Sequence, residues 1–321
     1  MTNAVTALLV TLLVGTGGVD TTIAVKRGMR LEVDNFAGDI QVRAWGRDAL
    51  RIEASHSRRT RVDIDREGQL IRLTAVGRMA PSSVDYRLTV PVWMALDLHG
   101  MSAEIDVSGT KAAITAKSVN GNVRIRGGAD NVSASSLQGL VVIEDARGRI
   151  EASSLNEGVK LRGIDGDVLA ESMNGIIVLD KVESKSLEAS TVNGSIVFAG
   201  PMLSGGLYSL STHNGSVIVG LPEKPDVTVS VATFSGGFSS SFPISLERGR
   251  RGKHFNFTLG SGSARLELES FQGSVQLSRY LELLKRLPAL EEEAQDDQDD
   301  GDVDYDNDGD ASPKHKTKHK D

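Results

Sequence analysis

Residues 114–126 read ITAKSVNGNVRIR, and this pattern returns along most of the chain. From Ile114 to Ser118, small or apolar residues alternate with polar ones, and the alternation resumes after the pair Asn120-Gly121. Successive side chains of a β-strand point to opposite faces. The stretch therefore predicts two half-buried strands joined by a tight turn.

The copies of this pattern recur at a nearly constant distance when they are aligned on the Asn120 position. The aligned residues, which we call the anchors, are Ser102, Asn120, Gln138, Asn156 and Asn174 at a spacing of 18, then Asn193, Asn214, Ser235 and Gln272, with an isolated earlier copy at Ala37. A fixed period of this length is typical of solenoids, in which each repeat packs only on its neighbours.

An Asn-Gly pair between alternating runs is also the strongest short hairpin signal, so an antiparallel meander is the alternative. A meander gives no reason for the small residues always to precede the turn and the large aliphatic ones always to follow it. Stacked coils give one, because equivalent side chains then lie about 4.8 Å apart in columns. We therefore predict an all-β, parallel, right-handed β-solenoid, or β-helix, with coils of about 18 residues.

The turn position is expected to form a column of its own. Side-chain amides at that position can bond from coil to coil and form a ladder. The predicted ladder consists of Asn120, Gln138, Asn156, Asn174, Asn193 and Asn214. Glu157 stands at the position that Gly121, Gly139, Gly175 and Gly194 hold in other copies, so either Glu157 is strained in a left-handed conformation or the turn shifts to Gly158.

The chain begins with an apolar run over residues 4–14, which is shorter than the roughly 20 residues that span a bilayer. This run predicts a signal peptide over residues 1–24 and a secreted, periplasmic or cell-surface protein, although no Lys or Arg precedes Lys26. A buried first strand is the alternative. The chain has no cysteine, which excludes disulfides and lipid attachment through a thiol.

Beyond this segment we predict an N-terminal β module over 25–100 that enters the solenoid, and repeats over 101–278. Leucines at helical spacing predict an amphipathic helix over 279–294 that covers the open end of the stack. A disordered acidic and basic tail over 295–321 follows. Residues 282–321 hold 14 acids and 6 bases, so the tail accounts for the net charge of −7, and the rest of the chain is nearly neutral and predicts no nucleic-acid partner.

Two segments are candidate binding sites. In the tail, Asp304, Asp306 and Asp308 match the opening of an EF-hand loop and form a weak Ca²⁺ candidate, although His315 replaces the usual final Glu. No other cofactor is predicted. A candidate anion-binding loop, for which a plain exposed hairpin loop is the alternative, consists of Arg248, Arg250, Arg251 and Lys253.

Catalytic motifs are missing: the sequence has no nucleophile elbow, no phosphate-binding loop and no dinucleotide-binding glycine pattern. Carboxylates such as Asp145 and Asp165 could approach each other across coils, which keeps a polysaccharide-active enzyme as an alternative. Solvated carboxylates at strand edges are the commoner case. The sequence therefore predicts a protein that is not an enzyme.

Residues 31–42 (LEVDNFAGDIQV), residues 84–100 (VDYRLTVPVWMALDLHG) and the repeated S-x-N-G units carry a family resemblance. Over roughly residues 26–278 the chain resembles the bacterial DUF4097 family of β-strand repeat proteins, which is related to head-domain autotransporter adhesin-like proteins. The resemblance implies an extracytoplasmic solenoid with an adhesin-like role and no catalytic residues. We expect its partner to be an envelope or surface component, either protein or glycan, with self-association through exposed coil ends as the alternative.

Overall fold

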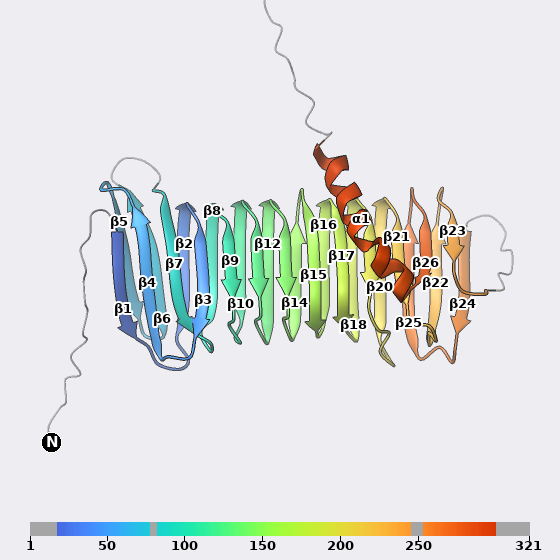
Figure 1. The fold of residues 1–321 in the computed structure, drawn as a ribbon, viewed down its shortest axis with the longest axis horizontal. Coiled ribbons are helices and arrows are strands. Elements are labelled where there is room, and N and C mark those ends of the chain that lie inside the picture. Colours follow the sequence, from blue (N-terminus) through green and yellow to red (C-terminus); the bar gives the residue numbers. More distant parts are fainter. Residues whose placement is uncertain (1–17, 78–81, 245–252, 300–321) are drawn as a thin grey trace, which may run out of the picture.

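In the computed structural model, which describes residues 18–77, 82–244 and 253–299, the strands form two thirteen-stranded sheets (Figure 1). Sheet 1 has the spatial order β1 (Gly18–Ala24), β4 (Ala49–His56), β7 (Val84–Pro91), β3 (Ile40–Trp45), β9 (Ile105–Ser108), β11 (Val123–Arg126), β13 (Val141–Glu144), β15 (Gly158–Asp165), β17 (Ile176–Glu183), β19 (Ile196–Ala199), β21 (Val217–Leu221), β26 (Val275–Arg279) and β23 (Phe238–Ser240). Sheet 2 has the order β24 (Lys253–Leu259), β22 (Val227–Thr233), β25 (Ala264–Ser270), β20 (Leu207–Asn214), β18 (Ser186–Asn193), β16 (Val168–Asn174), β14 (Arg149–Ser154), β12 (Asn131–Gln138), β10 (Ile114–Asn120), β8 (Ala95–Ser102), β2 (Arg30–Ala37), β6 (Leu70–Gly77) and β5 (Thr60–Glu67).

The central strands confirm the predicted solenoid. Each coil gives one strand to each sheet, and neighbouring coils pair in parallel with equivalent residues side by side, as Ala116 with Ala134 and Ile125 with Ile143. The inward residues of both sheets form one continuous hydrophobic core from Val25 to Leu277. The segment 25–100 therefore contributes strands to the same two sheets and shares this core.

At the two ends of the stack, the spatial order of the coils departs from their order in the chain. The last coil, β25–β26, lies between β20–β21 and β22–β23, so the Gln272 copy is the neighbour of the Asn214 copy. At the other end, β2–β3 pairs with β8–β9, and β6–β7 lies outside it. Antiparallel strands complete both ends: β1, β4 and β5 at one and β24 at the other.

The first described strand overlaps the predicted signal peptide. β1, Gly18–Ala24, pairs antiparallel with β4 along its whole length, and Arg51 of β4 bonds to Asp20 at 3.0 Å. These seven residues were expected to belong to the signal peptide, whereas the structure makes them an edge strand of sheet 1. The remaining predicted leader, residues 1–17, lies outside the described residues.

The expectation that the C-terminal helix covers the open end of the stack is wrong. α1 (Tyr280–Asp299) crosses the outer face of sheet 1 over β17, β19 and β21 (Figure 1). Its buried Leu283 and Leu287 pack in a second cluster with outward residues of these strands, namely Ile176, Val178, Val197, Ala199 and Ile218. The outer face of sheet 1 is apolar where α1 lies. Burial of this apolar surface stabilises the helix in that position. α1 also runs five residues into the predicted disordered tail.

One corner of the stack is held by a repeated hydrogen bond. In six coils an inward Ser or Thr donates its hydroxyl to the turn carbonyl of the neighbouring coil at 2.7–3.2 Å: Ser118 to Ala103, Ser136 to Gly121, Ser154 to Gly139, Thr191 to Gly175, Thr212 to Gly194 and Ser270 to Gly215. These donors are buried. The small residues before each turn thus satisfy a carbonyl that lies away from water.

The glycine that follows each anchor is required by the same close approach. A Cβ added to Gly175 would lie 2.5 Å from the carbonyl oxygen of Glu157 in the preceding coil, and the φ of Gly175 is +143°. Glu157 itself lacks a positive φ, and Gly158 takes it instead at +116°. The turn has therefore shifted by one residue, which is the second of the two alternatives predicted for this copy.

Amide side chains line the outside of this corner. Asn174 donates to Asn156 at 3.2 Å, Asn193 to Asn174 at 2.8 Å, and Asn214 to Asn193 at 2.7 Å. Four of the predicted ladder residues are thus joined in one chain of hydrogen bonds. Asn120 and Gln138, the other two, are neighbours in the strand register.

The corner hydrogen bond predicts a position-specific stability effect. Ser136→Ala leaves the carbonyl of Gly121 without its donor and should reduce the free energy of unfolding by about 1–3 kcal/mol. Ser135→Ala, on the outward side of the same strand, should change it by less than about 0.5 kcal/mol. Urea denaturation of both variants measures this difference. Equal losses would contradict the role of the hydroxyl.

A second set of local hydrogen bonds stabilises the turn at residues 260–263. Oδ1 of Asp226 accepts hydrogen bonds from the backbone N–H groups of Ser261, Gly262 and Ser263 at 2.7, 2.6 and 3.2 Å. Hydrogen bonds from the hydroxyls of Ser261 and Ser263, followed by these backbone groups, lower the pKa of Asp226 from 3.8 to about 2. The charged carboxylate is therefore the form that the turn stabilises.

This depressed pKa predicts a pH-dependent contribution to stability. Because the folded pKa is below the unfolded one, the contribution is present above about pH 4 and is lost as the pH falls towards 2. Asp226→Asn should lower the melting temperature at pH 7, and its difference from the wild type should shrink between pH 4 and pH 2. Thermal melts across pH 2–7 measure this, and a pH-independent difference would contradict it.

Candidate functional site

A row of outward residues crosses sheet 1 from coil to coil. Arg43, Ser108, Arg126 and Glu144 are successive cross-strand neighbours on β3, β9, β11 and β13. Arg126 forms an ion pair with Glu144 at 2.5 Å, and this hydrogen bond raises the pKa of Arg126. Arg43 forms no ion pair with any residue in the described part of the chain. The row therefore has a paired arginine and an unpaired one on either side of a small serine.

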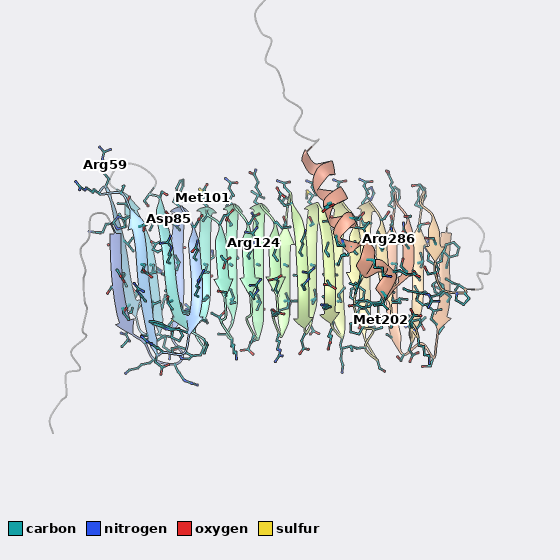
Figure 2. All side chains as sticks on the ribbon, in the orientation of Figure 1. Arg59, Asp85, Met101, Arg124, Met202 and Arg286 are labelled. Atoms are coloured by element: carbon teal, nitrogen blue, oxygen red, sulfur yellow. The ribbon has the colours of Figure 1, made fainter. Side chains whose placement is uncertain are left out.

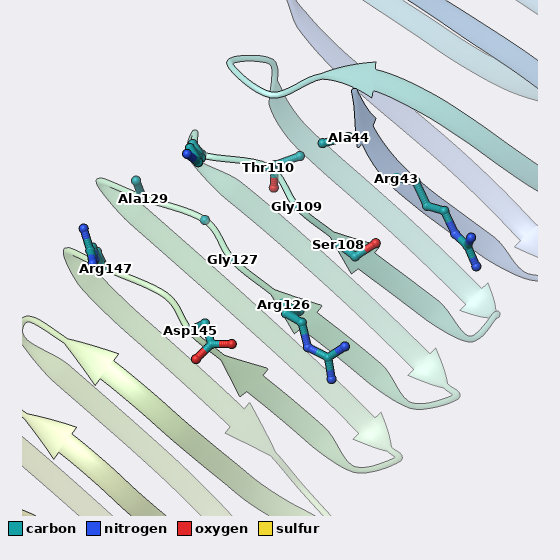
Figure 3. A pocket seen from close by; sticks show the side chains of 12 residues that line it. Arg43, Ala44, Ser108, Gly109, Thr110, Arg126, Gly127, Ala129, Asp145 and Arg147 are labelled. Atoms are coloured by element: carbon teal, nitrogen blue, oxygen red, sulfur yellow. The ribbon is translucent and has the colours of Figure 1, made fainter. Parts of the chain in front are cut away.

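At the end of these strands the surface is hollowed into an open depression of about 710 Å³ (Figure 3). Figure 3 shows Arg43 and Arg126 extending in the same direction on either side of Ser108. The charged residues that line the depression are Arg43, Lys111, Arg126, Arg147 and Asp145. Four cations and one anion thus surround one space, which we call the basic depression.

Glycine turns shape the floor of the basic depression. Gly109, Gly127 and Gly128 have φ values of +83°, +102° and +97°, and a Cβ on Gly127 would lie 2.8 Å from the carbonyl oxygen of Thr110. The N–H groups of Gly109 and Gly127 bond to the next coil, to Arg126 and Glu144. Since these backbone donors are already used, recognition of a ligand here falls to the side chains.

The unpaired cations suit this depression to anionic groups. Among the described residues, Arg43, Lys111 and Arg147 have no ion-pair partner, and all three are exposed. Guanidinium groups present a planar fork of donors that matches phosphate, sulfate and carboxylate groups. Strand spacing separates β3 from β11 by about 10 Å, so one group or two consecutive groups of a polymer could lie over Ser108.

Some of the carboxylates near this site are held in ion pairs. Glu144 is paired with Arg126, and Asp180 is paired with Arg162 at 3.0 Å. Asp165 lies beside Arg147 in the strand register, and Asp145 lines the basic depression. Within residues 18–77, 82–244 and 253–299, no group of three His, Asp or Glu residues is placed to hold a metal.

Most residues of the two binding sites predicted from sequence fall outside the described ranges. Arg248, Arg250 and Arg251 are outside the described residues, and Lys253 begins β24. The Ca²⁺ candidates Asp304, Asp306 and Asp308 are also outside them. The basic depression was missed because its cations come from distant positions in the chain. Its signal in the sequence is a basic residue at or just after the end of the second strand in several coils.

A second surface feature follows the corner of sheet 2. The residue just before each anchor points outward and is apolar or aromatic in every coil, where alternation predicts a polar residue. We call this row the apolar ridge; in spatial order it contains Phe36, Met101, Val119, Leu137, Leu155, Met173, Val192, His213, Phe271 and Phe234. Leu155 is half-buried, and the exposed fractions of the eight ridge residues other than Leu155 and His213 run from 38% at Val119 to 72% at Phe234. Met101 marks the ridge at the edge of the stack in Figure 2.

The apolar ridge ends in an aromatic stack. The rings of His213 and Phe271 are parallel to within 7°, with centroids 4.7 Å apart. Those of Phe271 and Phe234 are parallel to within 3° at the same distance. Three successive coils therefore hold these three rings in contact with one another.

No helix in the described ranges is both long and apolar enough to cross a membrane. α1 reaches only over one sheet and carries an acidic second half. The basic depression and the apolar ridge are the two candidate functional sites on the described part of the solenoid.

Comparison with known proteins adds the family. No curated protein matches the chain. Solved structures with similar chains include a candidate adhesin from Parabacteroides distasonis (10% identity, 82% of this chain and 97% of that chain, TM-score 0.37) and one from Bacteroides fragilis (12%, 82% and 98%, TM-score 0.32). Another is described as a candidate lipid-binding protein from Parabacteroides distasonis (10%, 82% and 97%, TM-score 0.31). Residues 29–278 match the sequence profile of the Toastrack DUF4097 family, to which this chain belongs.

Proposed function

We propose that this protein is a non-enzymatic, extracytoplasmic scaffold that binds an anionic glycan of a cell envelope or surface through the basic depression. The observation that carries the proposal is the gathering of four cations from neighbouring coils around one open space that holds a single carboxylate. Three of those cations have no ion pair within the described chain. Unpaired clustered charge raises the local concentration of an oppositely charged polymer.

The arrangement favours a polymer over a small anion. The depression is open and its cations come from four neighbouring coils, so successive charged groups can be met by successive side chains. Exposed charge pairs contribute only about 0.2–1 kcal/mol each. Several contacts along one polymer are therefore needed for useful affinity, and binding should weaken steeply with salt.

The sharpest test reverses charge within the depression. Arg43→Glu with Arg147→Glu should weaken binding to heparin, dextran sulfate or alginate at least tenfold in low salt, because like charges then meet the polymer. Arg265→Glu makes one charge reversal of the same kind on sheet 2 and should leave binding within about twofold. Biolayer interferometry with neutral dextran as the blank measures this. Equal binding by both variants would remove the depression from the proposal.

A polysaccharide-active enzyme is the second candidate, because Asp145 lines the same space. That alternative requires turnover of an anionic glycan that Asp145→Asn abolishes while binding persists. Reducing-end release over the same panel of polymers distinguishes the two functions. Binding without any cleavage supports the scaffold.

The extracytoplasmic location rests on the apolar run at residues 4–14. Because β1 belongs to sheet 1, we expect cleavage before Gly18, which leaves the edge strand intact. Expression with the native N-terminus in a bacterial host, followed by fractionation and intact mass measurement, checks both points. A full-length chain retained in the cytoplasm would contradict the proposed location.

A further inference from the structure

We propose that the apolar ridge is a dimer interface, in which two copies of this chain pack ridge against ridge in antiparallel orientation about a twofold axis. The proposal does not rest on the anionic-glycan function, since the ridge and the basic depression lie at opposite corners of the coil. The ridge residues lie at the ends of strands of sheet 2, and the depression lies at the ends of strands of sheet 1. α1 packs on sheet 1, and no other element of the described ranges packs on the outer face of sheet 2.

The amount of exposed apolar surface is the first argument. From their exposed fractions and ordinary side-chain sizes, the ridge residues offer on the order of 700 Å² per copy. A standard protein interface takes about 800 Å² from each partner, and the largest apolar patch on a typical monomer is about 300–600 Å². The ridge is therefore near the size that a stable dimer needs.

The spacing of the side chains is the second argument. The ridge presents one apolar side chain per strand, so its knobs repeat about every 4.8 Å over ten coils, a length of about 43 Å. A second ridge with the same repeat can place its knobs between those of the first along the whole length, as in interdigitated sheets. A second copy of this chain necessarily has the same repeat. A twofold arrangement then closes the interface in a dimer.

The polar residues beside the ridge select the antiparallel orientation. On one flank the anchors are uncharged in all ten coils, which gives the apolar strip a neutral polar rim. On the other flank, an antiparallel twofold places Glu269 opposite the partner's His99 and Lys117 opposite the partner's Ser211. A parallel arrangement needs the twofold axis along the ridge, which exchanges the flanks and places each charged residue opposite an uncharged anchor of the partner. Only the antiparallel pairing brings the carboxylate of Glu269 against the imidazole of the partner's His99, so this orientation is preferred.

The oligomeric state of the full chain tests the interface. By sedimentation velocity over 1–100 µM, the wild type should show a reversible dimer, and Leu137→Ser with Met173→Ser should raise the dissociation constant at least tenfold. Leu207→Ser removes a comparably exposed apolar residue at the opposite end of its strand and should have less than a twofold effect. A wild type that stays monomeric at 100 µM, or a dimer that the double variant leaves unchanged, overturns the proposal.

Single cysteines test the orientation, since the chain has none of its own. The twofold axis passes between Leu155 and Met173, so Leu155→Cys should oxidise to a disulfide-linked dimer. Phe36→Cys should not, because it lies about 43 Å from the partner's Phe36, but it should cross-link with Phe234→Cys in a mixture of the two. Cross-linking of Phe36→Cys with itself would show a parallel pair and overturn the antiparallel arrangement.

A flotation assay distinguishes a second copy of the chain from a lipid membrane as the partner of the apolar ridge. Vesicles of phosphatidylcholine, with and without phosphatidylglycerol, are mixed with the wild type and the double variant in a flotation assay. A monomeric wild type that floats with vesicles, and a double variant that does not, would assign the ridge to a membrane and overturn the dimer. Loss of the dimer with unchanged glycan binding would leave the proposed function intact.

Discussion

The fold depends on the close contact between successive coils at the Asn-Gly corner. There the backbone of one coil comes so near the next that a Cβ does not fit, and the carbonyl at that point is buried. The hydroxyl of the following coil satisfies it, as Ser136 does for Gly121. A buried carbonyl without a donor costs about 1–3 kcal/mol, and the corner recurs in most coils. Glycine and the small hydroxyl residue are therefore constrained together.

This constraint fixes the rows on the outside of the molecule. Once the corner sets the register, every outward position forms a column along the stack. A residue type that is kept at one position of the repeat therefore occurs once in every coil of that column. The amides of Asn156, Asn174, Asn193 and Asn214 become a hydrogen-bonded chain. One apolar residue per coil becomes the apolar ridge. A column is thus the natural unit of function on such a surface.

The sequence predicts the central coils well because their information is local and repeated. Ile114, Ala116 and Ser118 mark the inward face, and the equivalent residues of the next coil fall beside them in the structure. The order of the end coils was not predictable in this way, since strand pairing between the Asn214 and Gln272 copies spans 58 residues and skips a coil. Position along the chain does not specify which neighbour a terminal coil chooses.

The helix and the basic depression were not predicted from the sequence for two different reasons. The site of α1 was visible in principle, because residues 176–179 (IIVL) and 196–199 (IVFA) lose the polar alternation of other coils and so require cover on both faces. The signal was missed because the helix was assigned to the open end. The basic depression has no such local signal: Arg43 and Arg147 are ordinary outward residues until the register brings their coils together.

The positions of the two surfaces have a joint consequence. The corner that carries the apolar ridge is opposite the one that carries the basic depression, so a ridge-to-ridge dimer would leave both depressions open. Two anion-binding sites in one rigid assembly can engage a single polymer or two neighbouring ones. The second contact then forms at a high effective concentration, and the overall affinity exceeds that of either site by about 10²–10⁴ where the geometry allows both. Weak individual charge pairs are compatible with strong retention on a polyanionic surface for this reason.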